Sequence, residues 1–170
     1  QVNEKTKVIF ICNPNNPTGT IVFKEEVDAF LEKLPEGILV IFDEAYFEFV
    51  EDARYPNGLD YFRLGKEVAV IRSFSKIYGL AGCRIGYGIA RREIISALDK
   101  VREPHNVNSL AQIAAAVSLD YQDEVRRRKK LNSVGKNYLY KGLTRLGLSY
   151  VPSEANFILI DVRENCREVF

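Results

Sequence analysis

Three short runs of uninterrupted apolar residues constrain the fold of this 170-residue chain more than any other feature of its sequence. They occupy residues 8–12, 38–42 and 68–71, and turn-forming or charged residues bound each run. An apolar run of this length without alternation is typical of a strand that is buried on both faces of a parallel sheet. We therefore predict three parallel strands within an α/β fold.

The connection between the first two runs has the pattern of an amphipathic helix. Its apolar residues are spaced i, i+3, i+4 and i+7, at Val27, Phe30, Leu31 and Leu34. This spacing gives one apolar stripe over about three turns, and Pro35 ends the helix. A strand, a helix and a strand joined by short links form a right-handed unit with parallel strands. The second connection, at 47–66, is irregular and predicts a short helix at 59–64.

The rest of the chain predicts one antiparallel strand, three helices and a second, smaller sheet. The fourth strand, at 84–90, follows the third after about a dozen residues, too few for a parallel crossover, and therefore runs antiparallel to it. The later helices and strands are expected at 91–102, 109–119, 121–146, 148–151 and 156–162. The apolar breadth of the helix at 109–119 indicates burial on most sides. We expect a partial large domain at 1–120, an interdomain helix at 121–147 and the start of a small domain at 148–170.

Composition and charge argue against several classes of protein. The 24 basic and 23 acidic residues give a net charge of +1, so no overall field attracts nucleic acid or an anionic membrane. No apolar run approaches the roughly 20 residues that span a bilayer. The three cysteines form no metal-binding pattern, and a reducing cytosol is the expected compartment. The basic run at 126–130 follows Asp123 and Glu124 at helical spacing, which favours a solvated helix face over a nucleic-acid site.

Polar residues follow all three apolar runs, at the point where each strand ends. Asn16 follows the first run, Asp43 and Tyr46 follow the second, and Ser73 and Lys76 follow the third. The carboxyl ends of parallel strands meet at one edge of a sheet, where ligands bind in open α/β folds. We therefore expect these side chains to surround one site.

The stretch at 71–84 carries the chemistry of this predicted site. The amine of Lys76 can hold an aldehyde, provided that burial or a nearby cation such as Arg84 frees it from its proton. Ser73, Ser75 and Arg84 offer hydrogen-bond donors that suit a phosphate dianion. Taken alone, the stretch is equally compatible with a solvated lysine beside a glycine turn. The convergence of three strand ends favours the site.

Four segments, at 13–19, 43–46, 73–76 and 82–87, resemble in order and spacing the motifs of the fold type I, pyridoxal-phosphate-dependent aminotransferases of classes I and II. Residues 102–112 resemble the histidinol-phosphate branch of that family more than its aspartate or alanine branches. The resemblance covers nearly the whole chain. It implies a three-layer, aspartate aminotransferase-like large domain with a mostly parallel sheet, followed by the start of a small α+β C-terminal domain.

The resemblance also implies the cofactor and the role of each site residue. Pyridoxal 5'-phosphate is the implied cofactor, and Lys76 is the catalytic residue that binds its aldehyde and then shuttles a proton. Asp43 pairs with the ring nitrogen and keeps it protonated, so that the ring accepts electrons. The other implied cofactor ligands are Asn16 and Tyr46 at the ring oxygen, and Ser73, Ser75 and Arg84 at the phosphate.

The implied reaction converts histidinol phosphate and 2-oxoglutarate to imidazole-acetol phosphate and glutamate, a step of histidine biosynthesis, in a cytoplasmic homodimer. Three alternatives remain: an amino-acid phosphate decarboxylase, another class I or II aminotransferase, and a catalytically silent module of the same fold. His105 stands where the branch more often has an aromatic residue, and we interpret it as a turn residue after Pro104. The chain begins at Gln1 and stops as a helix begins near 164–170, so we expect a fragment.

Overall fold

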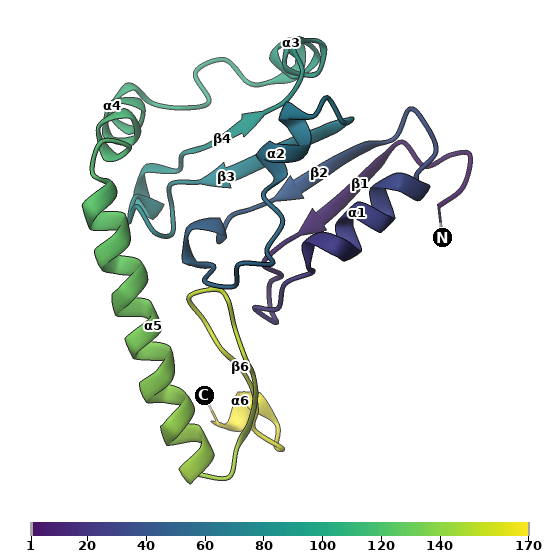
Figure 1. Ribbon diagram of the computed structural model, residues 1–170. Coiled ribbons are helices and arrows are strands. Elements are labelled where there is room, and N and C mark those ends of the chain that lie inside the picture. The colour runs from purple at the N-terminus through teal and green to yellow at the C-terminus, as the bar shows by residue number, and fades with distance from the viewer. Residues whose placement is uncertain (1, 170) are drawn as a thin grey trace.

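The computed structural model describes residues 2–169, and a four-stranded sheet dominates the first half of the chain (Figure 1). The strands lie side by side in chain order, as β1 Val8–Cys12, β2 Leu39–Asp43, β3 Val68–Ser73 and β4 Gly86–Ile89. β1, β2 and β3 are parallel and β4 is antiparallel to β3, as predicted. β4 begins at Gly86 rather than Arg84, because Arg84 has a left-handed φ of 53° that a strand does not accommodate.

Six helices and two short 3-10 helices connect and follow the strands within residues 2–169. Their bounds are α1 Lys24–Lys33, α2 Gly58–Arg63, α3 Arg92–Val101, α4 Ser109–Ser118, α5 Gln122–Arg145, α6 Cys166–Val169, η1 Phe47–Phe49 and η2 Ala81–Cys83. Asparagine side chains cap the starts of α2 and α4: at α4, Asn108 Oδ1 accepts from the Ala111 amide at 2.8 Å. The predicted bounds of α2, α3, α4 and α5 are confirmed to within one residue at each end.

The main core lies on one face of the sheet, under α1 and α2. Alternate residues of β2 and β3 point into it, and Phe42 stacks on Tyr61 of α2 with the ring centroids 5.6 Å apart. On β1, however, Val8 is 45% exposed and Phe10 is 66% exposed. The prediction that this first strand is buried on both faces is therefore wrong, because the helices of both connections, α1 and α2, pack on the same face of the sheet.

The long helix α5 runs from α4, beside the sheet, to a two-stranded hairpin (Figure 1). The hairpin strands, β5 Ser149–Val151 and β6 Leu159–Asp161, are antiparallel. Residues 152–158 leave the hairpin and reach the loops of the main sheet, so β6 begins later than the predicted residue 156. Ala155 is fully buried there in a second core cluster with Tyr46, Phe49 and Ile77. The division into domains at 120 and 147 stays a prediction.

Candidate active site

A pocket of about 250 Å³ lies at the carboxyl ends of β2 and β3. Its wall includes four of the predicted cofactor ligands, namely Asp43, Ser73, Ser75 and Arg84. The register of the sheet explains why they meet, because Asp43 is paired with Ile71 and Ser73 is paired with Gly86. These four residues therefore form one group, which brings together the ends of β2 and β3 and the turn before β4 but not the residues after β1.

The carboxylate of Asp43 is held at the end of β2 by the backbone that follows it. Its Oδ1 accepts a hydrogen bond from the Ala45 amide at 3.2 Å. The backbone carbonyl of Asp43 accepts from the Asn13 amide at 3.0 Å, and this ties the end of β2 to the loop after β1. The arrangement points one negative charge into the pocket from a fixed backbone.

The pocket lining also presents hydrogen-bond donors and a cation. The Ser75 amide donates to Ser73 Oγ at 3.0 Å, which fixes the turn after β3. Arg84 is exposed, and its Nη1 donates to the Ala81 carbonyl at 2.8 Å within its own turn. A side chain at Gly86 would put its Cβ 2.8 Å from the Arg72 carbonyl oxygen, so glycine allows the close approach of the two strands here. Two hydroxyls and a guanidinium in this lining suit an anion.

The remaining predicted residues form a second group beside the pocket. Asn16 Nδ2 donates to the Tyr46 hydroxyl at 3.0 Å, although the two residues lie 30 positions apart. Lys76 Nζ lies 5.3 Å from the centroid of the Tyr46 ring. Asp43 and Tyr46 share one loop, and Ser75 and Lys76 are adjacent, so the two groups are continuous. Lys76 itself is exposed, and the burial considered for its amine is not observed among the described residues.

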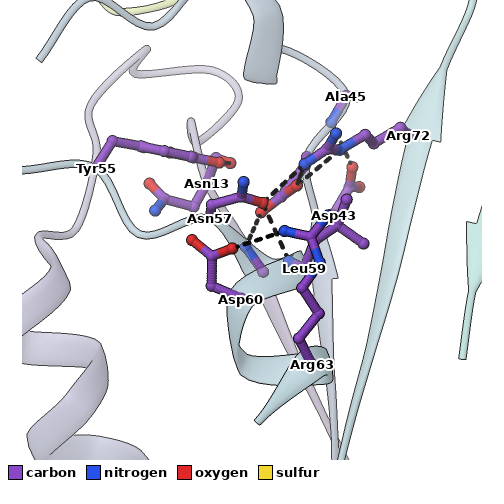
Figure 2. A network of polar contacts seen from close by, with 11 residues as sticks. Asn13, Asp43, Ala45, Tyr55, Asn57, Leu59, Asp60, Arg63 and Arg72 are labelled. Atoms are coloured by element: carbon purple, nitrogen blue, oxygen red, sulfur yellow. Dashed lines mark hydrogen bonds and ion pairs between the residues drawn. The ribbon is translucent and has the colours of Figure 1, made fainter. Parts of the chain in front are cut away.

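A buried ion pair that the sequence did not predict joins Glu44, the residue after Asp43, to Arg72, which Figure 2 shows within a polar network. Arg72 Nε and Nη2 donate to Glu44 Oε2 at 2.9 and 2.7 Å, and the Glu44 side chain is fully buried. Glu44 Oε1 accepts from the Gly58 amide at 2.7 Å, so both carboxylate oxygens are satisfied. Burial alone would lower the pKa of Arg72, but the adjacent Glu44 carboxylate raises it above its ordinary value.

The same arginine, on β3, contacts both the segment that follows β2 and the loop that precedes α2. Its Nη2 also donates to Asn57 Oδ1 at 3.0 Å, and its guanidinium lies 3.6 Å from the centroid of the Phe47 ring. Asn57 in turn caps α2 by accepting from the Leu59 amide at 3.1 Å. No local pattern in the sequence signals this network, because Glu44 and Arg72 lie 28 positions apart. It fixes both strands that carry Asp43 and Ser73.

One buried carboxyl oxygen near this network is unsatisfied. Glu48 Oε2 has no hydrogen-bond partner among residues 2–169. Burial raises the pKa of Glu48 to about 6.

His105, the one histidine of the sequence, does not join the site. His105 lies exposed in the turn after Pro104 with a φ of 58°, which confirms its interpretation as a turn residue.

Among residues 2–169 no three His, Cys, Asp or Glu side chains are grouped to hold a metal ion. No helix in this part of the chain combines the length and apolar character needed to cross a bilayer.

A family model described as aminotransferase class I and II matches residues 1–168. The chain therefore belongs to the class I and II aminotransferases. It is 52% identical over 170 residues to the histidinol-phosphate aminotransferase of Moorella thermoacetica, a match that covers 99% of this chain and 44% of that relative. The chain spans about half the length, 44–47%, of the curated relatives it matches.

Solved structures with the same arrangement support this membership. Histidinol-phosphate aminotransferase from Sinorhizobium meliloti, in complex with pyridoxal-5'-phosphate, matches with a TM-score of 0.84 and 31% identity over 95% of this chain and 44% of that chain. Aspartate aminotransferase from Thermus thermophilus with maleate matches with a TM-score of 0.83 and 25% identity over the same shares. The chain has the aspartate aminotransferase-like fold that its sequence predicted.

Proposed function

We propose that this chain forms the greater part of the cofactor site of a pyridoxal-phosphate-dependent aminotransferase. The observation that carries the proposal is that Asp43, Ser73, Ser75 and Arg84 line one pocket, and Lys76 directly follows Ser75. A carboxylate, two hydroxyls and a guanidinium around one pocket fit a ligand that has a basic ring nitrogen and a phosphate. Pyridoxal 5'-phosphate has both groups.

Each residue has a distinct task in this proposal. The negative charge of Asp43 keeps a proton on the ring nitrogen, since an opposite charge favours the protonated form. Ser73, Ser75 and Arg84 donate to the phosphate, and the Asn16–Tyr46 pair orients the ring oxygen. When bound, the cofactor withdraws electrons from the substrate carbon that loses its proton.

Lys76 has two tasks, to hold the cofactor aldehyde and to move a proton. Its amine lies beside the Tyr46 ring, which limits the directions that the side chain can take. Its free amine would be the base that takes the proton from the substrate α-carbon and the acid that returns it, while the bound cofactor would supply the electron sink for that carbon.

We propose histidinol phosphate and 2-oxoglutarate as the substrates, with imidazole-acetol phosphate and glutamate as the products. The names of the relatives at 42–52% identity support this choice over the other class I and II reactions. A role in histidine biosynthesis, a cytoplasmic location and a homodimeric state follow from the same resemblance and belong to the proposal.

The test measures covalent attachment of the cofactor in the intact protein. Pyridoxal 5'-phosphate is added, the adduct is reduced with sodium borohydride, and the modified peptide is identified by mass spectrometry. We expect the label on Lys76, and we expect Lys76→Ala to lose the label and several orders of magnitude of transaminase activity. Lys66→Ala, at another exposed lysine, is the control and should retain both. A label elsewhere in wild type would contradict the assignment.

Product analysis separates the proposed reaction from its nearest rival. Release of carbon dioxide from an amino-acid phosphate would indicate a decarboxylase. Formation of glutamate from histidinol phosphate and 2-oxoglutarate would indicate the transaminase. A protein that binds the cofactor at Lys76 yet forms neither product would be another class I or II aminotransferase, which transaminates a different amino donor, or a silent module, which transaminates none.

A further inference from the structure

The inward face of α5 carries a row of hydrogen-bond donors that point at backbone carbonyls. Arg128 Nη1 donates to the Ile77 carbonyl at 2.9 Å, and Asn132 Nδ2 donates to the Ala155 carbonyl at 3.2 Å. The ammonium groups of Lys129 and Lys136 donate to the Val50 and Ser153 carbonyls. Every acceptor is in a loop that borders the second core cluster, beneath Tyr46. α5 therefore supports these loops through polar contacts.

The Arg128 contact falls on the turn that carries Lys76. The Gly79 amide donates to the Lys76 carbonyl at 3.0 Å and closes this turn. The Ile77 side chain, 1% exposed, anchors the turn in the cluster with Tyr46 and Phe49. The Ile77 carbonyl faces the other way and accepts from Arg128, so the residue next to the lysine is held on both sides.

The fit between Arg128 and this turn is close. Gly79 has a φ of +73°, and a Cβ at this position would lie 2.7 Å from Arg128 Nη1. Glu124 orients the guanidinium from one turn earlier on α5, because Arg128 Nε donates to Glu124 Oε1 at 2.7 Å. A planar guanidinium can serve both acceptors at once, whereas a lysine ammonium at the end of a flexible stem is less fixed.

We infer that Arg128 is a positioning residue for Lys76, which acts through the Ile77 carbonyl to hold the turn where the amine meets the cofactor. This inference rests on the proposed function. Because the Lys76 side chain is exposed, the position of its amine depends mainly on the backbone of the turn. The hydrogen bond that Arg128 donates to the adjacent Ile77 carbonyl therefore helps to set where the amine lies. A small misplacement of a reacting group lowers the rate steeply.

The neighbouring Arg127 provides a matched control. It also pairs with Glu124, with Nε 2.7 Å from Oε2, but its side chain is 65% exposed against 37% for Arg128. Its contacts are with Glu124 on its own helix. Arg127→Ala therefore removes the same kind of ion pair without touching the Lys76 turn.

The experiment compares Arg128→Ala, Arg128→Lys and Arg127→Ala in the intact protein. For each variant, the rate at which pyridoxal 5'-phosphate and borohydride label Lys76 is measured, together with kcat and KM for the amino donor. We expect Arg128→Ala to lower the labelling rate and kcat roughly 10- to 100-fold while KM does not rise. Arg128→Lys should recover part of this loss, because it can still donate to the Ile77 carbonyl. Arg127→Ala should stay within about twofold of wild type.

The outcomes separate this inference from the proposed function. Lys76 labelling that is equal in Arg128→Ala and Arg127→Ala would overturn the inference alone, and so would a rise in KM at constant kcat. Absence of Lys76 labelling in wild type would overturn both. If Arg128→Ala does not fold, Gly79→Ala tests the same contact by displacing the guanidinium. Its control is Gly65→Ala, which has a φ of +76° and open space around the added Cβ, and Gly79→Ala should label Lys76 more slowly than this control.

Discussion

The Glu48 carboxyl is buried, and its Oε2 has no hydrogen-bond partner among residues 2–169. Its ionisation therefore makes the free energy of unfolding depend on pH. In the unfolded chain a glutamate titrates near 4.5, whereas in the fold burial raises the pKa of Glu48 to about 6. Between these values the folded state retains a proton that the unfolded state has released. The free energy of unfolding therefore falls as pH rises from 4.5 to 6, by about 2 kcal/mol at most for this group.

Glu48→Gln should remove this pH dependence, because glutamine has the same shape and does not ionise. We expect the variant and wild type to differ little near pH 4.5, and the variant to be more stable above pH 6 by up to about 2 kcal/mol. Urea unfolding of both proteins across this pH range measures the difference directly. A difference that is constant with pH would mean that Glu48 does not titrate in this window.

The site residues that could be predicted from the sequence are marked by a local pattern, whereas those that could not be predicted are recognised only through a partner far away in the chain. Asp43 and Ser73 each follow an apolar run and line one pocket, and Asn16, which follows the first run, pairs with Tyr46 beside it, so the local pattern and the rule for parallel strands indicated where these residues lie. Glu44 and Arg72 neutralise each other across two strands, and neither position has a local signal. A buried charge is recognised through its partner, and the partner is known only once the register is known.

A contact between two distant elements supports the loop that carries Asn16. The Glu154 amide, just after β5, donates to the Gly19 carbonyl at 2.8 Å. Gly19 has a φ of +72°, and a Cβ added there would lie 2.1 Å from Ser153 Oγ and 2.6 Å from Ser153 Cβ. Rotation of the serine side chain cannot relieve the second clash, so the two segments would have to separate.

Gly19→Ala should therefore lower the free energy of unfolding more than a substitution that introduces backbone strain alone. Gly37 is the matched control, since its φ of +80° is similar and a Cβ there meets nothing within 4 Å. Gly37→Ala should lower the free energy of unfolding by about 1–2 kcal/mol, and Gly19→Ala by a further 1–3 kcal/mol. Urea denaturation measures the free energy of unfolding of both variants. Equal losses would show that Ser153 moves away from the added Cβ at no measurable cost.

At the level of elements, the strands and helices were predictable because their apolar patterns act locally. The orientation of α5 was not. The run 126–130 was predicted to be a solvated face, which is correct for Arg126 and Arg127, but Arg128 and Lys129 turn inward to backbone carbonyls. The apolar residues Leu131, Val134 and Tyr138 of α5 are 60–78% exposed. Every residue has the same backbone carbonyl, whatever its side chain. A helix face that donates to such carbonyls therefore has no matching pattern of side chains elsewhere in the sequence by which it could be predicted.

The whole molecule, as residues 2–169 describe it, leaves much apolar surface open to solvent. On α4 only Ala111 and Ala115 are buried, whereas Leu110 is 77% exposed and Ile113 is 62% exposed. The prediction that this helix is buried on most sides is therefore wrong for the described residues. β1, at one edge of the sheet, adds Phe10 at 66% exposure. Such surfaces usually mark interfaces, and an unpaired strand edge favours association.

The isolated 170-residue polypeptide should accordingly self-associate and bind pyridoxal 5'-phosphate more weakly than the intact protein. We expect oligomers or aggregates in size-exclusion chromatography with light scattering, and strong binding of a dye for apolar surface. Phe10→Lys puts a charge on the exposed edge strand and should reduce association without restoring transaminase activity. Leu34→Lys, at the residue after α1 that packs against the main core, is a contrasting variant that should increase dye binding through loss of packing. A compact monomer of the 170 residues with full activity would contradict the prediction, because the exposed faces of β1 and α4 would then need no further covering.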